Sequence, residues 1–338
     1  MSPQGTLVLA IDAGGSNTRA VVVDADARCL GYGASSSGNP TAIGPVAALR
    51  AIGAAGRAAL EEAGAAPEQI SRTVLAAAGA TDQMPDPARE LGLHPGAIQH
   101  VGDVLGMYHS AAVEPAGIAI VSGTGAVAGR ISTLVVERVH DGLGWLLGDA
   151  GSGFSIGRDV VRAVAADLDG TGPTTALTPL VLGHYGLANG GTSRNGRPEV
   201  LLALLRAVYD DAPVRLARLA PLAFQADDDA VASRIVDEAD AALASLVRRV
   251  RDGHGELPVV VGGSVLTEGM LARGDLGALG DALAGADVRR ARDGVAGAAV
   301  VGLLALGVQL DADRLRRLAA DIAGRQGPPP ASLPHGSS

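Results

Sequence analysis

The sequence contains no lysine, because all 27 of its basic residues are arginines. A chain without lysine cannot form a lysine Schiff base, a P-loop or the strand lysine of a protein kinase, so three large enzyme classes are excluded. Aromatic residues are scarce at 2% of the chain, which excludes stacking platforms for single-stranded nucleic acid. We therefore expect a ligand to be held by polar side chains and backbone groups.

Cysteine is almost absent, and Cys29 is the one example. A single thiol excludes intrachain disulfides and cysteine-based zinc sites, so we expect a reducing, cytoplasmic setting. The N-terminal residues lack a basic region followed by an apolar stretch, and nothing in them predicts export. The strongly apolar, uncharged run 294–310 is shorter than the ~20 residues that span a bilayer. It predicts a buried helix packed closely on a neighbour.

The net charge is −9, from 36 acidic and 27 basic residues. Such a surface has no general attraction for phosphate backbones or anionic membranes, so neither nucleic acid nor a membrane is an expected partner. Apolar residues make up 47% of the 338 residues, which is enough to bury the cores of about two domains.

A strand–turn–strand pattern opens the chain. The apolar run 7–11 and the run 19–24, which is rich in β-branched residues, are typical of β-strands, and the glycine-containing turn 12–18 joins them. Dinucleotide and P-loop motifs place their glycines between a strand and a helix, so the β-branched run after this turn argues against both. A third strand over 29–34 completes a predicted meander.

The pattern recurs in the second half, where the turn 122–125 lies between the apolar run 117–121 and predicted strands at 126–131 and 134–139. This weak internal duplication predicts two domains, each a mixed sheet with helices. Further predicted elements are strands at 73–77, 98–101 and 258–261 and helices at 45–62, 104–112 and 153–168.

Glycine turns next to carboxylates carry the candidate chemistry. The turns at 14–16, 122–125 and 262–264 could each hold a phosphate through backbone N–H groups, although such turns are also common in structural hairpins. Asp12 favours function, because the metal of a bound nucleotide needs a carboxylate close to the phosphate turn.

Three polar residues near these turns are further candidates. Asp103 follows a predicted strand and opens a predicted helix, where it either caps the helix or acts in catalysis. Asp149 lies in the glycine-rich segment 144–153, and such a loop inside a globular chain is more often a ligand loop than a spacer. Asn39 is either a turn residue or a partner for hydroxyl groups.

Two other patterns compete with this interpretation. Residues 153–157 match the GxSxG nucleophile elbow of serine esterases, with Ser155 as the nucleophile, but no apolar strand precedes them as that motif requires. The seven histidines include no HExxH pair, and His94, His100 and His109 lack the spacing of metal ligands. A histidine-based metal site is therefore not expected.

Six motifs in order resemble a known family. They are LAIDAGGSNTRAVVVD, SSSGNPTAIG, the strand-end GD at Asp103, IVSGTGAVAGR, GLGWLLGDAGSGFSIG and VVVGGSVLTEG. Together they resemble the N-acetylglucosamine kinase branch of the BadF/BadG/BcrA/BcrD-type ATPases, within the actin-like superfamily. The resemblance implies an α/β fold of two actin-like (ribonuclease H-like) domains, each a mixed sheet with helices, flanking a nucleotide and sugar cleft.

The duplication and the resemblance also suggest where the domains begin and end. We expect an N-terminal actin-like domain over 1–115 and a C-terminal actin-like domain over 116–311. A helix at 312–323 is expected to pack back on the first domain, and the proline- and serine-rich residues 325–338 are expected to form a disordered tail.

The resemblance implies roles for individual residues. The ATP-binding residues it implies are Gly14, Gly15, Ser16, Thr124, Gly125, Ala217, Gly262, Gly263, Ser264 and Val265, with Asp12 holding Mg²⁺. The substrate-binding residues it implies are Asn39, Asp103, Gly125, Ala126, Gly142, Gly144 and Asp149. Asp103 matches the catalytic base of the family.

The sequence departs from the family pattern at a few positions. Ala13 and Ser16 stand where the family prefers glycine and threonine, and both changes are conservative. Ala150 replaces a glutamate that is common in relatives, and Ala126 and Val127 follow the second turn where polar residues are usual. The surroundings of the sugar are therefore comparatively apolar, which favours a neutral acetylated sugar.

The resemblance thus implies a cytoplasmic, homodimeric sugar kinase that transfers the γ-phosphoryl of Mg-ATP to the 6-hydroxyl of N-acetylglucosamine or a close amino sugar. Glucosamine and N-acetylmuramate kinases of the same fold, a non-catalytic sugar sensor and a serine esterase stay open as alternatives. The CoA dehydratase activators of the same superfamily are disfavoured, because each subunit needs more than one cysteine to hold an iron–sulfur cluster.

Overall fold

The computed structural model describes residues 5–15, 17–77, 84–188, 190, 193–194, 196–226, 228–274 and 276–326. The chain forms two compact units: unit 1 comprises Met1–Ala116, Ile131–Val136 and Ala291–Ser338, and unit 2 comprises Gly117–Arg130 and Glu137–Arg290. Ser16 and residues 327–338 of the expected tail lie outside the described residues.

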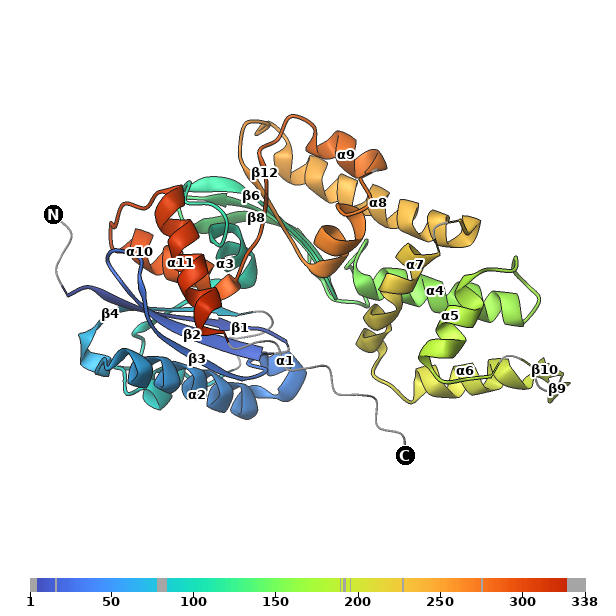
Figure 1. The fold of residues 1–338 in the computed structure, drawn as a ribbon, viewed down its shortest axis with the longest axis horizontal. Coiled ribbons are helices and arrows are strands. Elements are labelled where there is room, and N and C mark those ends of the chain that lie inside the picture. The colour runs from blue at the N-terminus through green and yellow to red at the C-terminus, as the bar shows by residue number, and fades with distance from the viewer. Residues whose placement is uncertain are drawn as a thin grey trace. The chain divides into compact units, whose positions relative to one another are not determined.

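Unit 1 is built on a five-stranded mixed sheet (Figure 1), whose strands are β1 (Leu7–Ala13), β2 (Asn17–Asp24), β3 (Cys29–Ser36), β4 (Ile70–Ala77) and β5 (Ile98–Gly102). They stand in the order β3-β2-β1-β4-β5. The β1–β2 and β2–β3 pairs are antiparallel, which confirms the predicted meander, and the β1–β4 and β4–β5 pairs are parallel.

Helices cover both faces of this sheet. α2 (Pro45–Ala63) packs on β1, β2 and β3 and shares a buried core with Leu9 and Ile11. α10 (Gly294–Ala305) packs on β1, β2 and β4 and contacts Val8. Because successive strand residues point to opposite faces, Leu9 packs toward α2 on one face of the sheet and Val8 packs toward α10 on the other.

The predicted buried helix is confirmed, although α10 ends at Ala305 and not near 310. It crosses α3 (Asp103–His109) closely, since a Cβ added at Gly297 would lie 1.6 Å from the carbonyl oxygen of Gly106. Glycine is needed there because a methyl group would overlap the backbone of α3. Among the described residues, no helix is long and apolar enough to cross a membrane.

α3 ends at His109, three residues before the expected end at 112, and the histidine is fully buried. Its Nδ1 lies 3.0 Å from the carbonyl oxygen of Ala112, so the neutral ring carries its proton on Nδ1. Its Nε2 has no hydrogen-bond partner among the described residues. Burial lowers the pKa of His109 to about 4 and outweighs the raising effect of the hydrogen bond to Ala112.

We expect His109 to make unit 1 less stable in acid. The unfolded chain binds this proton near its ordinary pKa of 6.5, whereas the folded chain binds it only near 4, so stability is complete above 6.5 and is lost as the pH falls through that window. Chemical denaturation of wild type and His109→Asn measures the effect. The stability advantage of wild type is expected to shrink by about 3 kcal/mol between pH 7 and pH 4, and a constant difference would contradict the expectation.

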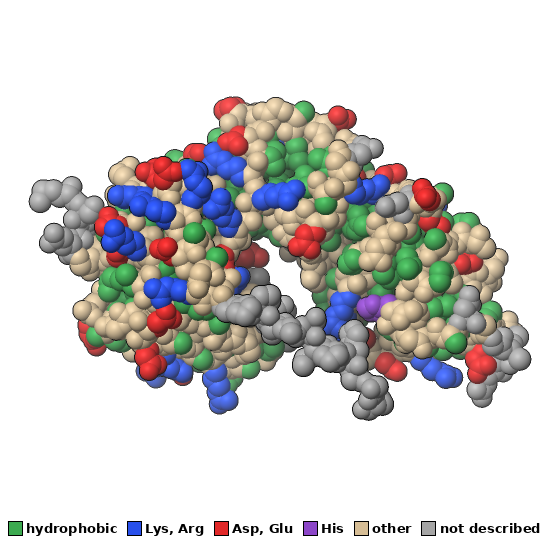
Figure 2. Space-filling view, in the orientation of Figure 1, with side chains coloured by type: hydrophobic (Ala, Val, Ile, Leu, Met, Phe, Trp, Pro, Cys, Tyr) green, Lys and Arg blue, Asp and Glu red, His purple; other side chains and the backbone are tan. Residues whose placement is uncertain are grey.

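The C-terminal helix α11 (Ala312–Arg325) packs on α10 and β3. Arg325 pairs with Glu62 and donates a hydrogen bond to the carbonyl oxygen of Cys29 at 3.0 Å. On the face shown in Figure 2, arginine side chains gather over this helix. The expected tail therefore starts too early, because residue 325 is still helical.

The expected domain boundary at 311 also needs correction. α10 packs on the first sheet, so unit 2 ends at Arg290. The tip of the hairpin at Ile131–Val136 belongs to unit 1 as well, where Thr133 N–H donates to the carbonyl oxygen of Pro115 at 2.8 Å.

Unit 2 repeats the sheet of unit 1 with β6 (Ala116–Ser122), β7 (Ala126–Ser132), β8 (Val135–Asp141), β11 (Val259–Gly262) and β12 (Val288–Arg290). The order is β12-β11-β6-β7-β8, so three consecutive strands are again followed by two later ones on the side of the first. This topology confirms the predicted duplication. β12 was not predicted, because its three residues include two arginines and lack a strand pattern.

The rest of unit 2 consists of helices and a short antiparallel pair of strands, β9 (Ser193–Arg194) and β10 (Arg197–Pro198). The helices are α4 (Gly153–Leu168), α5 (Leu177–His184), α6 (Glu199–Tyr209), the 3-10 helix η4 (Pro213–Leu219), α7 (Ala220–Gln225), α8 (Ala230–Arg251), the π-helical turn η5 (Val265–Met270) and α9 (Gly277–Leu283). α4 starts and ends where the sequence predicted. One cluster of buried side chains joins α4, α5, α7 and α8 to β6 and β11. The loops of the candidate site in this unit begin or end at these elements.

Candidate functional site

A salt-bridged carboxylate lies near the end of β1 in unit 1. Asp12 is the register partner of Arg19 in the β1–β2 hairpin, and Arg19 Nη2 donates to Asp12 Oδ2 at 2.9 Å. Arg19 Nη1 donates to Asp293 Oδ2 at 3.0 Å. Asp293 is the N-cap of α10, where its Oδ1 accepts a hydrogen bond from Val295 N–H. Arg19 thus links Asp12, the predicted metal ligand, to the start of α10.

The surroundings of Asp12 are crowded. A Cβ at Gly294 would lie 2.8 Å from Asp12 Oδ2, so a larger residue would displace the carboxylate. Burial raises the pKa of Asp12, more than the neighbouring Arg19 lowers it, and the negative charges of Asp293 and Asp103 raise it further. A nearby cation, either arginine or metal, keeps such a group ionised.

The segment that contains Asn39 folds onto the first glycine turn. Gly14 N–H donates to the carbonyl oxygen of Asn17 at 3.0 Å, which closes the turn. The carbonyl oxygen of Gly14 accepts hydrogen bonds from Gly38 N–H at 3.2 Å and from Ser37 Oγ at 3.3 Å. Unit 1 therefore brings Asn39 close to this turn, although Ser16 within it lies outside the described residues.

Asp103 is the first residue of α3 and not its cap. The N-cap position belongs to Gly102, and Asp103 Oδ1 accepts a hydrogen bond from Val104 N–H at 2.9 Å. Loss of water around the carboxylate raises the pKa of Asp103, against the lowering effect of Val104 N–H. A raised pKa makes a carboxylate a better proton acceptor, and a general base requires this property.

Two glycine turns meet in unit 2. Gly123 N–H donates to the carbonyl oxygen of Gly125 at 3.0 Å, which closes the turn between β6 and β7. Gly263 follows β11 with φ +87°, and a Cβ there would lie 2.3 Å from the backbone of Ser122. Only glycine permits this approach, so the turn after β11 lies directly against the end of β6.

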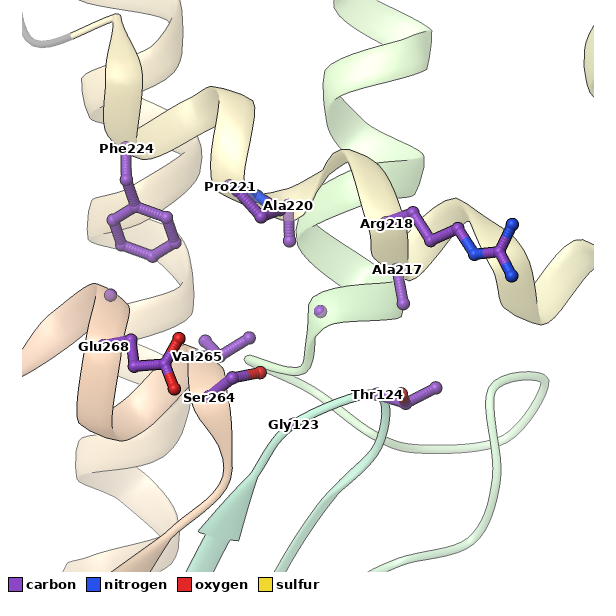
Figure 3. Close-up of a pocket in the computed structure, with 12 residues that line it drawn as sticks. Gly123, Thr124, Ala217, Arg218, Ala220, Pro221, Phe224, Ser264, Val265 and Glu268 are labelled. Atoms are coloured by element: carbon purple, nitrogen blue, oxygen red, sulfur yellow. The ribbon is translucent and has the colours of Figure 1, made fainter. Parts of the chain in front are cut away.

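A cavity of about 360 Å³ opens beside these turns (Figure 3). Four of the predicted ATP-binding residues line it: Thr124, Ala217, Ser264 and Val265. Its full lining is Gly123, Thr124, Gly153, Ala217, Arg218, Ala220, Pro221, Phe224, Ser264, Val265, Glu268 and Gly269. Segments far apart in the sequence thus form one cavity inside unit 2.

Several side chains of this cavity were not predicted from the sequence, among them Phe224, Glu268 and Arg218. Phe224 and Glu268 lie on one side of it, and Arg218 extends away on the other (Figure 3). Gly269 leaves room for the aromatic ring, because a Cβ there would lie 2.7 Å from Phe224 Cζ. A signal existed for Phe224, since it is one of only two phenylalanines in the chain.

The glycine-rich segment 144–153, predicted as a ligand loop, contains Asp149 in unit 2. Asp149 is buried with φ +60°, and its Oδ1 accepts a hydrogen bond from Ala126 N–H at 3.2 Å. Gly142 N–H donates to the carbonyl oxygen of Ala126 at 2.9 Å, and Gly142 and Gly144 have positive φ. Unit 2 therefore brings Gly142, Ala126 and Asp149 together. Burial raises the pKa of Asp149, partly opposed by Ala126 N–H.

Asp141 organises this loop and was also missed. It has φ +62°, and its carboxylate accepts hydrogen bonds from Asp149 N–H at 2.6 Å and from Ala150 N–H at 3.1 Å. The available signal was an aspartate directly before a glycine, a pair typical of turns. Asp141 therefore fixes the backbone that presents Asp149.

Helix packing explains the GxSxG match, and the surroundings of Ser155 are not those of an esterase nucleophile. Ser155 lies in the first turn of α4 after a loop, and its Oγ donates to the carbonyl oxygen of Ser152 at 3.0 Å. A Cβ at Gly157 would lie 1.9 Å from the carbonyl oxygen of Leu216, so this glycine lets η4 approach α4. The two outer glycines of the motif therefore shape the wall of the cavity, since Gly153 also lines it.

A divalent cation would not find a complete protein site here. Among the described residues, no group of three or more His, Cys, Asp or Glu side chains is placed to hold a metal ion. Asp12 alone still fits Mg²⁺, which is commonly bound by one or two carboxylates together with substrate phosphates and waters.

Solved structures of several sugar kinases share this fold. One described as an N-acetylglucosamine kinase from Chromobacterium violaceum has a TM-score of 0.66 and 23% identity, over 87% of this chain and 98% of that one. One from Porphyromonas gingivalis has a TM-score of 0.63 and 21% identity, over 88% and 99%. A ROK hexokinase from Thermus thermophilus has a TM-score of 0.50 and 20% identity, over 89% and 99%. The fold is therefore that of the actin-like sugar kinases.

Sequence comparison gives the family. The model of the BadF/BadG/BcrA/BcrD ATPase family matches residues 9–302, so the chain belongs to the BadF/BadG/BcrA/BcrD ATPase family, as its motifs predicted. The N-acetyl-D-glucosamine kinase of Dictyostelium discoideum is 30% identical over 164 residues, which are 46% of this chain and 49% of that protein. The chain thus spans about half the length of this relative.

Proposed function

We propose that the protein is an ATP-dependent sugar kinase, which transfers the γ-phosphoryl of Mg-ATP to the 6-hydroxyl of N-acetylglucosamine or a close amino sugar. The observation that carries the proposal is the cavity of unit 2, where the turn at Thr124 and the turn at Ser264 meet beside an apolar wall. A nucleotide needs both features, because its phosphates bind backbone N–H groups and its base binds apolar surface. Membership of an ATPase family and the names of the relatives support it.

The chemistry assigned to unit 1 is proton transfer and metal binding. The Asp103 carboxylate accepts the proton of the 6-hydroxyl while the sugar oxygen bonds to the γ-phosphorus and the bond to the β-phosphate oxygen breaks, which releases ADP. Mg²⁺ bound near Asp12 would spread the charge of the phosphate oxygens. With no lysine in the chain, backbone N–H groups and this cation supply most of the positive potential.

The sugar side of the proposal rests on Asp149 and Asn39 as partners for hydroxyl groups. Asp149 is held from two directions, by Ala126 N–H on its carboxylate and by Asp141 on its backbone. A carboxylate fixed in this way can orient a hydroxyl without losing side-chain entropy on binding. Gly125 keeps the space beside it open, because a Cβ there would lie 3.1 Å from Asp149 Oδ2.

We expect kcat/KM for N-acetylglucosamine to exceed that for glucosamine, and by more at pH 6 than at pH 9. The acetamido group is neutral, whereas the ammonium of glucosamine would need an additional carboxylate, since burying an unpaired charge costs several kcal/mol. The free amine is largely neutral at the higher pH, so the penalty becomes smaller. Steady-state kinetics on both sugars measures this, and a preference for glucosamine at pH 6 would show that a carboxylate faces the 2-position.

The test of the proposed activity is ADP formation with Mg-ATP and a panel of N-acetylglucosamine, glucosamine, N-acetylmuramate and glucose. Sugar-dependent ADP formation is expected for the first of these. A sensor of the same fold would instead bind sugar with no ADP formed, which calorimetry distinguishes. We further propose that the enzyme works in the cytoplasm, where ATP is available, and as a homodimer, whose mass light scattering measures directly.

A further inference from the structure

Arg19 joins two carboxylates that come from opposite ends of the chain. One of its terminal nitrogens bonds Asp12 at 2.9 Å and the other bonds Asp293 at 3.0 Å. All three side chains are mostly buried, with exposed fractions of 25% for Arg19, 17% for Asp12 and 15% for Asp293. The Gln326 side chain also donates a hydrogen bond to Asp293 Oδ2. Arg19 is therefore fixed beside Asp12, the carboxylate to which we assign metal binding.

The charges of this group balance only in part. Two carboxylates and one guanidinium leave a single negative charge, and Asp103 is near enough to act electrostatically on Asp12. Without Arg19, Asp12 and Asp293 would be a pair of uncompensated carboxylates, and such a pair attracts divalent cations. With Arg19, one oxygen of Asp12 is already occupied, and an approaching dication meets a fixed positive charge.

We propose that Arg19 is the resident counter-cation of Asp12, which keeps free divalent cations off this carboxylate and leaves the metal to arrive with the nucleotide. The inference rests on the proposed role of Asp12. A metal–nucleotide complex carries net negative charge on its phosphates, so the guanidinium attracts that complex and repels the bare cation. Arg19 is thus a positioning residue that makes metal binding depend on nucleotide.

A purely structural role for Arg19, as a clamp between β1 and α10, would have a different signature. Removal of a clamp lowers stability without raising affinity for anything, whereas removal of a counter-cation creates a site for metal. Affinity for metal alone therefore separates the two roles. It also separates this inference from the proposed kinase activity, because neither sugar nor ATP is present.

The experiment titrates Mn²⁺ alone, as a spectroscopic substitute for Mg²⁺, into wild type, Arg19→Met and Arg19→Lys and detects bound ion by electron paramagnetic resonance. We expect Arg19→Met to bind Mn²⁺ at least ~10-fold more tightly than wild type, and Arg19→Lys to keep the weak binding of wild type. The double variant Asp12→Asn/Arg19→Met is expected to lose the gained affinity, which would locate it at Asp12.

Equal Mn²⁺ affinity in wild type and Arg19→Met, with both proteins folded by circular dichroism, would overturn the inference. Tight binding that persists in the double variant would overturn it as well, because the ion would then sit elsewhere. If Arg19→Met does not fold, Arg19→Gln replaces it, since glutamine keeps one hydrogen bond to a carboxylate while it removes the charge. The same two outcomes would then overturn the inference.

Discussion

Asp103→Asn is expected to bind ATP and sugar with near-normal affinity and to lose at least ~10²-fold in kcat. Asparagine has nearly the same shape as aspartate but cannot accept a proton from the attacking hydroxyl. Asp103 is the first residue of α3 with its carboxylate held by Val104 N–H, so the substitution changes charge more than position. Single-turnover kinetics with independent binding measurements separates the chemical step from affinity.

Ser155→Ala is the matched control for this experiment, because Ser155 is the nucleophile of the competing esterase motif. Among the described residues its hydroxyl bonds the backbone of Ser152 and no other group, so turnover of the variant is expected to stay near that of wild type. Wild-type turnover in Asp103→Asn would remove Asp103 from catalysis. Complete loss of activity in a folded Ser155→Ala protein would revive the esterase alternative.

Gly297→Ala is expected to destabilise unit 1 by about 3 kcal/mol or more. The added methyl group would lie 1.6 Å from the carbonyl oxygen of Gly106, so α3 and α10 would have to move apart. Both helices pack on the first sheet, and separation would expose buried apolar surface. Denaturant unfolding followed by circular dichroism measures the loss.

Gly324→Ala provides the control, because it also places alanine in a helix of unit 1 but meets no atom within 4 Å. Alanine is the better helix former, so this variant is expected to be as stable as wild type or slightly more stable. If both substitutions had the same effect, the close crossing of α3 and α10 would not be a determinant of stability.

Much of the fold could be predicted because it follows from local patterns. The meander of unit 1 has β-branched runs on each side of a glycine turn, and α4 begins and ends at the predicted residues. The assignment of α10 to the C-terminal domain was wrong, because its sequence indicates only that the helix is buried. Which sheet buries it depends on a long-range contact, the close approach of Gly302 to Val8, and sequence pattern does not report such contacts.

The candidate site was predictable where glycines mark a turn and not where a side chain arrives from a distant element. Gly263 was identified because its turn has a recognisable composition. Phe224 and Glu268 enter the cavity from helical segments whose patterns reflect burial alone. Arg19 is an intermediate case, because the hairpin register that places it opposite Asp12 follows from the predicted turn. Its second partner, Asp293, required the structure.

The most direct measurement is the chemical identity of the product when the purified protein is incubated with Mg-ATP and N-acetylglucosamine. Phosphorus NMR together with mass spectrometry determines whether a phosphate has been transferred and to which oxygen. The account predicts one phosphate on the 6-oxygen of the sugar and one ADP for each sugar phosphorylated. ATP consumed with no phosphosugar formed, or no reaction with any sugar of the panel by a folded protein, would contradict it.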